Sequence, residues 1–211
     1  MNLRPALLAA ALLAVGALAA SAVEVPAQPP AFTAAEAKAL AAGKPVKKAE
    51  VFDTREGGRA ARAVVYIRID APPAAILRTV LDYDRYPEFY PNLPECALYR
   101  QEGNVYFARF VLAIAGGIVK IRYHCRHVYD PEARAVTWTL DPDRANEIKE
   151  TTGFWKAWET EPGRCLVGYS LWLDSGRKVP KFIENLGTDY GLRKVATCMK
   201  ARVESLARAG R

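Results

Sequence analysis

Two histidines lie in the run His124-Cys125-Arg126-His127, where a pair of imidazoles could bind a metal ion or transfer a proton. The run falls in an alternating, strand-like segment, and side chains an odd number of positions apart on a strand point to opposite faces. Only Cys125 and His127 therefore share a face, and no cluster of carboxylates accompanies them. We predict no metal site and no cofactor, and we interpret His127 as a polar residue in an apolar wall.

Common catalytic motifs are missing from the sequence, which has no G-x-S-x-G turn, no H-E-x-x-H motif and no glycine-rich phosphate loop. Glu147 and Glu150 fall on opposite faces of one predicted strand, which weakens a paired acid–base site. An enzyme that works by shape and exclusion of water needs no such motif. Catalysis therefore stays open as an alternative, with Tyr123, His127 or Tyr169 as proton-handling groups.

The four cysteines are widely spaced, at Cys96, Cys125, Cys165 and Cys198, without a C-x-x-C pair. This spacing argues against a zinc site and against a thioredoxin-like motif. Three disulfide pairings are possible. The absence of any disulfide is an equal alternative, because Cys125, Cys165 and Cys198 have apolar neighbours and a free, buried cysteine behaves as a small hydrophobic residue.

Eight segments have the composition of strands and are separated by turns rich in Gly, Asp and Pro. They are residues 46–53, 59–69, 96–100, 105–114, 119–129, 135–140, 147–160 and 165–174. After the second segment, Pro73 opens a predicted helix, which a short aromatic turn follows. That turn could plug one end of a sheet; its rings are Tyr83, Tyr86, Phe89 and Tyr90. A long helix over residues 181–209 is predicted to close the chain, so the order is α+β.

Strand parity predicts one apolar, aromatic face of the sheet, which the last helix must cover. If sheet and helix do not meet fully, a cavity with a few polar groups remains between them; if they do meet, the same residues form a filled core. Periodicity alone does not separate these alternatives. The candidate ligand-binding residues are Tyr106, Phe110, Tyr123, His127, Trp138, Trp155, Tyr169, Leu171, Phe182, Leu186 and Tyr190.

The first 22 residues have the pattern of a signal peptide. Arg4 is followed by an apolar run over residues 6–20, and Ala20-Ser21-Ala22 is a small-residue cleavage site. We predict an exported protein, periplasmic or secreted, cut after Ala22. Residues 23–45 are predicted to be a linker with a short helix that Thr33 caps, and residues 46–209 form the main domain.

Positive charge is concentrated near the end of the chain. The formal net charge is +7, and residues 177–211 contain nine Lys and Arg residues against three acidic residues. A basic helix could contact anionic lipid head groups, although an ordinary solvated helix face has the same composition. Export disfavours nucleic acid as a partner.

The stretch VYIRIDAPPAAILRTVLDYDRYPEFYPNL, residues 65–93, resembles the beginning of START-like (SRPBCC) helix-grip proteins. This superfamily includes lipid-transfer START domains, polyketide cyclases and coenzyme Q-binding proteins. The stretch GFWKAWETEPGRCLVGYSLWLDSG, residues 153–176, and RKVPKFIEN after it are similar to the second half of these proteins.

The resemblance implies an antiparallel sheet wrapped around a long C-terminal helix, with two short helices after the first strands. It also favours the cavity over the filled core, because this superfamily uses the space for lipids, sterols, polyketides or quinones. A gate formed by the loop of residues 141–146 and the helix start near residues 179–186 is a further expectation. The main hypothesis is an exported protein that binds or transfers a lipid; the alternatives are an aromatase/cyclase-type enzyme and a partner-binding module with a filled core.

Overall fold

Eight strands form one antiparallel sheet in the computed structural model, which describes residues 23–53, 59–114, 117–174 and 189–210. The strands are β1 (Val46–Asp53), β2 (Arg59–Ile69), β3 (Glu95–Glu102), β4 (Val105–Ile114), β5 (Val119–Asp130), β6 (Ala135–Leu140), β7 (Glu150–Glu161) and β8 (Arg164–Asp174). The helical segments are α1 (Ala34–Ala41), α2 (Pro73–Leu81), the 3-10 helix η1 (Tyr83–Glu88) and α4 (Asp189–Arg208). The predicted α+β helix-grip architecture is confirmed.

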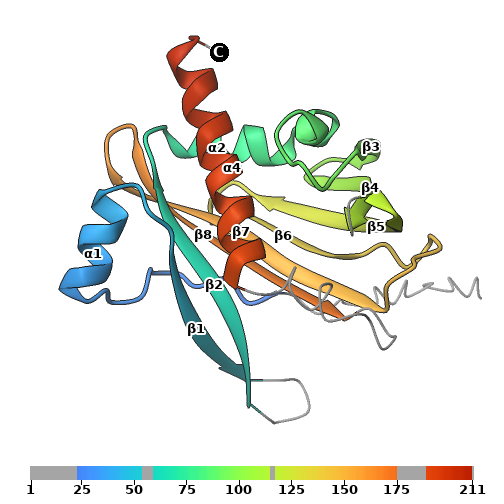
Figure 1. Cartoon of the computed structure of the whole chain (residues 1–211), viewed down its shortest axis with the longest axis horizontal. Helices are drawn as coiled ribbons and strands as arrows, with labels where there is room; N and C mark the ends of the chain where they lie inside the picture. The colour runs from blue at the N-terminus through green and yellow to red at the C-terminus, as the bar shows by residue number, and fades with distance from the viewer. Residues whose placement is uncertain (1–22, 54–58, 115–116, 175–188, 211) are drawn as a thin grey trace, which may run out of the picture.

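The order of the strands across the sheet is β1-β2-β8-β7-β6-β5-β4-β3. From β2 the chain passes through α2 and η1 to β3 at the far edge, and it then meanders back until β8 pairs with β2. The α2–η1 segment therefore lies on the same face as the last helix. Figure 1 shows α4 lying across the sheet with α2 beside it, and these two helices are in contact.

Local chemistry explains where the short helices begin. Thr33 and Glu36 form the predicted capping box, in which the Glu36 N–H donates to Thr33 Oγ1 and the Thr33 N–H donates to Glu36 Oε2 at 2.8 Å. Pro73 occupies the first turn of α2, where its missing N–H has no intrahelical partner to lose. The Tyr86 hydroxyl donates to the Val80 carbonyl at 2.5 Å and so ties η1 to α2.

The two faces of the sheet carry separate apolar cores. The inner core, under α2, η1 and α4, includes Ile67, Trp155 and Val167. The outer core contains Tyr66, Phe154 and Leu166, whose positions alternate with the inner residues along the same strands. The segment predicted to be a linker packs on this outer face, because Val23, Val25, Phe32 and Leu40 contact the outer core.

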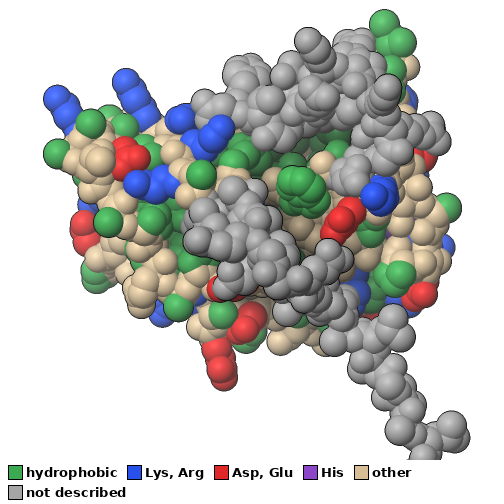
Figure 2. All heavy atoms as spheres, turned by 90° about the horizontal axis from the view of Figure 1, so that it is seen from below, with side chains coloured by type: hydrophobic (Ala, Val, Ile, Leu, Met, Phe, Trp, Pro, Cys, Tyr) green, Lys and Arg blue, Asp and Glu red, His purple; other side chains and the backbone are tan. Residues whose placement is uncertain are grey.

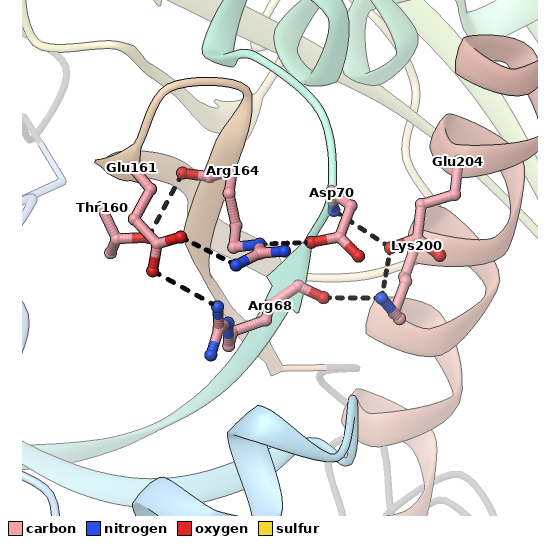
Figure 3. Close-up of polar contacts among 7 residues, drawn as sticks. All are labelled: Arg68, Asp70, Thr160, Glu161, Arg164, Lys200 and Glu204. Atoms are coloured by element: carbon pink, nitrogen blue, oxygen red, sulfur yellow. Dashed lines mark hydrogen bonds and ion pairs between the residues drawn. The ribbon is translucent and has the colours of Figure 1, made fainter.

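Polar contacts tie the C-terminal half of α4 to the end of β2 (Figure 3). Lys200 Nζ donates to the Arg68 carbonyl at 2.9 Å, and the Asp70 N–H donates to Glu204 Oε1 at 3.0 Å. Lys200 and Glu204 also form an ion pair with each other. The contacts continue to β8, because Arg164 Nε lies 2.8 Å from Asp70 Oδ1. This half of the helix is thereby held at one end of the sheet.

Strand ends agree closely with the sequence-based expectation, with one informative difference. The seventh strand begins at Glu150 and not at residue 147, because Glu147 belongs to a loop bound to β5. The helix α4 begins at Asp189 in the described part of the chain. Residues 181–188 of the predicted helix lie outside the described residues.

Candidate functional site

A cavity of about 650 Å³ lies between the inner face of the sheet and α4. Its floor comes from β4 to β8, and its sides come from α2, η1, the turn after η1 and the first turns of α4. The described part of the helix, Asp189–Arg208, packs mainly on β2 and α2, with further contacts to β1 and β8, and the cavity lies between it and the inner face of the central strands. Among the described residues, the expected gap between sheet and helix is therefore present.

Strand register brings the aromatic side chains of the floor together. Phe110 on β4 pairs with Tyr123 on β5, and His127 on β5 pairs with Trp138 on β6. Trp155 and Tyr169 pair across β7 and β8. Because directly opposite residues on a sheet share a face, these six rings point into one layer.

Gly153 makes room for one of these rings. It lies opposite Trp138, and a Cβ at this position would approach the Trp138 ring and the Ser170 carbonyl oxygen to 2.2 Å each. No real side chain tolerates such a distance. The absence of a side chain on β7 thus lets the Trp138 ring lie over the neighbouring strand.

Flat, stacked rings dominate the cavity wall. The Phe110 and Tyr123 rings are nearly parallel, with centroids 5.2 Å apart and an interplanar angle of 8°. The Trp155 and Tyr169 centroids are 4.2 Å apart at 28°, and the Trp138 and Tyr169 rings also stack, with centroids 6.1 Å apart. These surfaces suit an apolar molecule with flat faces.

His127 is the buried polar group that stands out in this wall. Its side chain is 6% exposed, and its Nδ1 atom has no hydrogen-bond partner among the described residues. Burial lowers the pKa of His127 to about 3, because the charged imidazolium is disfavoured away from water. The imidazole is therefore neutral at physiological pH and can accept or donate one hydrogen bond at Nδ1, depending on its tautomer.

A second buried polar group without a partner belongs to another residue that lines the cavity. The hydroxyl of Tyr90, in the turn after η1, is buried without a hydrogen-bond partner in the described part of the chain. Burial raises the pKa of Tyr90 well above its ordinary value, so the group is a neutral phenol. The Tyr83 hydroxyl also has no hydrogen-bond partner among the residues that the structure describes, and the Tyr83 ring packs against His127 with centroids 4.7 Å apart.

Lys194 contributes a positive charge at the helix side of the cavity. It is exposed, and it lines the cavity together with Gly191 and Val195 of α4. No acidic side chain is found among the described lining residues. Figure 2 shows hydrophobic side chains in the middle of one face of the molecule, with Lys and Arg side chains on either side.

Seven of the predicted ligand-binding residues line the cavity: Phe110, Tyr123, His127, Trp138, Trp155, Tyr169 and Leu171. Tyr106 shares their face but borders a separate surface pocket with Arg78 and Tyr129. Phe182 and Leu186 lie outside the described residues, as does the side chain of Tyr190. Whether these residues bind a ligand stays a prediction.

Sequence reasoning did not assign several lining residues to the site. Tyr86, Tyr90 and Leu93 belong to the aromatic turn, which was expected only to plug one end of the sheet. Val195 was part of the apolar stripe of the last helix. The sequence does not predict that Thr151 on β7 lines the cavity, because its neighbour Thr152 is the same residue type and the pattern does not show which of the two faces inward.

The loop between β6 and β7, expected to form part of a gate, is held on β5. The Asp141 N–H donates to the His124 carbonyl at 2.8 Å, and the Glu147 N–H donates to the Arg122 carbonyl at 2.9 Å. Tyr99 donates its hydroxyl to the buried Asp141 carboxylate at 2.5 Å. None of residues 141–146 lines the cavity. These contacts do not favour this loop as a gate, and the expected helix part at residues 179–186 lies outside the described residues.

The polar residues outside the cavity do not suggest further chemistry. Among residues that the structure describes, no three His, Cys, Asp or Glu side chains are grouped so that they could hold a metal ion. All four cysteines are free. No helix in the described ranges is long and apolar enough to cross a membrane.

A sheet that grips a C-terminal helix over an aromatic cavity defines the class of START-like helix-grip proteins, as the resemblance implied. Residues 60–210 match the family described as "Polyketide cyclase / dehydrase and lipid transport", and the chain belongs to this family. No protein with a curated description matches the chain.

Solved structures of distant relatives share the fold. The aromatase/cyclase ZhuI from Streptomyces sp. R1128 is similar with a TM-score of 0.61 and 13% identity, over 71% of this chain and 96% of the other. A STAR-related lipid transfer protein from Xanthomonas axonopodis has a TM-score of 0.61 and 12% identity, over 75% and 93%. Human STARD10 has a TM-score of 0.60 and 12% identity, over 76% and 74%. At these identities the likeness concerns the fold alone.

Proposed function

We propose that this protein binds one hydrophobic molecule, a lipid, in the cavity under α4 and carries it between membrane surfaces. The observation that supports this most is the cavity of about 650 Å³, whose wall is built from stacked aromatic rings. Removing apolar surface of a ligand from water is favourable by about 25 cal/mol per Å², so burial of the ligand in this cavity contributes to its binding free energy. The family description, which includes lipid transport, agrees with this function.

The place of action that we propose is the cell envelope. The signal-peptide pattern of residues 1–22 supports export, and the basic residues near the C-terminus support transient contact with anionic lipid head groups. N-terminal sequencing of protein recovered from the native cell envelope tests the export step. A mature chain that begins at Val23 is expected, and recovery of the intact chain from the cytoplasm contradicts it.

Carriage is tested on protein purified from its own cells. Native mass spectrometry should show one hydrophobic molecule per chain, and the protein should move that molecule between donor and acceptor liposomes. The proposed function is contradicted if the purified protein contains no hydrophobic molecule and transfers none between liposomes.

A second candidate function is an aromatase/cyclase-type reaction, and one observation favours it. His127 is a buried, neutral imidazole among the residues that line the cavity, and histidine is the side chain that most often serves as a general acid or base in enzymes. If the protein is such an enzyme, His127→Ala should abolish turnover and leave binding of the substrate largely intact. Equal turnover by the variant and the wild type excludes this role for His127.

A further inference from the structure

We propose that a surface pocket between α2 and the strand pair β4–β5 binds a small α-amino acid as its zwitterion. The pocket has a volume of about 420 Å³. It is lined by Ala74, Arg78, Leu81, Asp82, Tyr106 and Tyr129. None of these residues is among the described residues that line the cavity under α4, so this site is separate from the proposed lipid site and goes beyond the proposed function.

Helical spacing brings four of the six lining residues together. Ala74, Arg78 and Leu81 lie on one side of α2, because positions three and four apart are neighbours on a helix surface. Asp82 follows directly as the residue that caps the C-terminal end of this helix. The opposite side of α2, which carries Ile76, is buried in the inner core. The side that lines the pocket is thus the polar side of the helix.

The sheet contributes two tyrosines from its inner face. Tyr106 on β4 pairs with His127 on β5, and Tyr129 lies two positions further along β5, so the three side chains share one face. Neither tyrosine hydroxyl has a hydrogen-bond partner among the described residues. Both side chains are half-buried, and the buried polar atoms without a partner in the described part of the chain belong to Tyr83, Tyr90 and His127. The hydroxyls of Tyr106 and Tyr129 are therefore accessible to a ligand in the pocket.

Arg78 and Asp82 bring opposite charges to the same pocket without pairing with each other. They are four positions apart, a spacing at which opposite charges on a helix can form an ion pair. Both side chains are exposed, and neither forms a hydrogen bond or an ion pair with any residue that the structure describes. Arg85, the next cation along the chain, is bound to Glu88 at 2.7 Å. The pocket therefore offers one guanidinium and one carboxylate that are both available.

A ligand with both charges matches this pair better than a simple ion does. Asp82 repels a plain anion, and Arg78 repels a plain cation. An α-amino acid carries its carboxylate and its ammonium group on the same carbon atom, so the two groups that bind it must be neighbours, as residues on consecutive turns of one helix are. The planar guanidinium of Arg78 can bind the carboxylate through two hydrogen bonds, and the Asp82 carboxylate can accept from the ammonium group.

The remaining lining residues suit the rest of an amino acid. Ala74, Leu81 and the two tyrosine rings form an apolar wall, against which an aliphatic side chain is removed from water. The hydroxyls of Tyr106 and Tyr129 can donate to the carboxylate or accept from the ammonium group. A neutral polyol would use these hydroxyls but not the two charges, and charge-assisted hydrogen bonds are the stronger ones.

Three probes with the same side chain and different charges test the assignment. They are L-leucine, L-leucinamide, which lacks the carboxylate, and N-acetyl-L-leucine, which lacks the ammonium group. Dissociation constants at neutral pH are measured on the purified protein by NMR titration of its backbone amides. The amide signals of Ala74 and Leu81 report on the pocket, and those of Leu171 and Val195 report on the cavity under α4.

We expect L-leucine to bind most tightly of the three probes. Arg78→Gln should weaken L-leucine and N-acetyl-L-leucine by about three- to tenfold, the range of one hydrogen-bonded charge at an exposed site, and should not weaken L-leucinamide. Asp82→Asn should weaken L-leucine and L-leucinamide by the same factor and should not weaken N-acetyl-L-leucine. Arg208→Gln and Asp143→Asn, the same substitutions at exposed positions outside the pocket, are the matched controls and should change none of the constants.

Each other outcome overturns the inference. Equal constants for the three probes, or losses in the variants that do not follow the missing charge, overturn the assignment of a zwitterion. If L-leucine shifts neither Ala74 nor Leu81, or shifts only Leu171 and Val195, the pocket is not its site. Because Arg78 and Asp82 are exposed, both variants should fold as the wild type does, which circular dichroism checks. None of these results concerns the transfer of a lipid between liposomes, so the proposed function is decided by its own test.

Discussion

His127 shows how one buried side chain links the stability of the protein to pH. The folded protein does not protonate this ring until about pH 3, whereas an unfolded histidine takes up its proton near its ordinary pKa of 6.5. Between these values the unfolded state binds more protons than the folded state. Stability must therefore fall as the pH drops below 6.5.

The corresponding prediction concerns the slope of the unfolding free energy against pH. Between pH 6.5 and pH 5, His127 should remove about 1 kcal/mol of unfolding free energy per pH unit, and His127→Phe should lack this contribution. Glu36 and Glu88 have lowered pKa values and act below their ordinary value of 4.5, outside this window. Urea unfolding of both proteins at several pH values measures the two slopes. If the unfolding free energy depends on pH equally in the wild type and in His127→Phe, His127 is not buried as a neutral ring.

Gly153 provides the second prediction at this scale. Gly153→Ala brings a methyl group to 2.2 Å from the Ser170 carbonyl oxygen and the Trp138 ring, so the ring has to move into the cavity. We expect a loss of about 1–3 kcal/mol of stability, typical of overpacking, and weaker binding of pyrene, a flat apolar probe for the cavity.

Gly168→Ala is the matched control for this change. Its Cβ would meet the Trp158 ring at 2.9 Å, on the outer face of the sheet and away from the cavity. Gly168→Ala should lower stability without weakening the binding of pyrene. Equal effects of both substitutions on binding would contradict the placement of Trp138 in the cavity wall.

At the scale of elements, α4 has two halves with different surroundings. Its C-terminal half is tied to β2 through Lys200 and Glu204, whereas Gly191, Lys194 and Val195 near its beginning face the cavity. Because the C-terminal half is attached to β2, the first turns of the helix can lie over the inner face without closing the cavity. Packing of Leu192, Ala196, Met199 and Val203 holds the remainder of the helix on its neighbours.

This division predicts the effect of removing one polar contact. Lys200→Met leaves the Arg68 carbonyl and the Glu204 carboxylate without their shared cation, and it should cost about 1 kcal/mol of unfolding free energy. Lys194→Met, the same substitution on an exposed turn of the helix, should change stability by less than about 0.5 kcal/mol. Chemical unfolding of both variants provides the measurement, and equal losses would show that the polar contacts do not hold the helix.

Most elements could be predicted from the sequence, and the reasons are local. The strands β4 and β6 and the helix α2 begin and end at turn residues, proline or a change of periodicity, which the sequence displays directly. The cavity could not be derived in this way, because Phe110 or Tyr169 gives the same alternating pattern in a filled core and in a hollow one. The contribution of Tyr90 also escaped, since it depends on how the turn after η1 folds over strands distant in sequence.

At the scale of the whole molecule, an apolar core lies on each face of the sheet. Residues 23–45, expected to be a linker with a short helix, contribute to the outer core: Trp158 Nε1 donates to the Ala27 carbonyl at 2.9 Å, and the Phe32 ring meets Tyr66 edge-on, with centroids 5.4 Å apart. This segment lies outside the residues that match the family, which begin at residue 60. The packing of this segment on the outer face stabilises the sheet from the side opposite to the cavity.

A substitution on the outer face tests whether this face contributes to stability without contributing to ligand binding. Phe32→Ala removes a half-buried ring from Tyr66, and it should lower stability by about 2 kcal/mol, less than the loss for a fully buried ring. Binding of pyrene should not change, because Phe32 lies on the opposite side of the sheet from the cavity. Calorimetric unfolding and a binding titration measure the two effects, and loss of binding in this variant would contradict the separation of the two faces.

The cavity under α4 is the central claim, and the stoichiometry of ligand binding tests it most directly. Equilibrium dialysis should show one saturable pyrene site per wild-type chain. In the double variant Leu112→Trp, Leu171→Trp, two indole rings occupy the cavity floor, and the site should be lost while the protein remains folded. If the double variant binds pyrene as the wild type does, or if the wild type binds none, the space between the sheet and the helix is not the binding site.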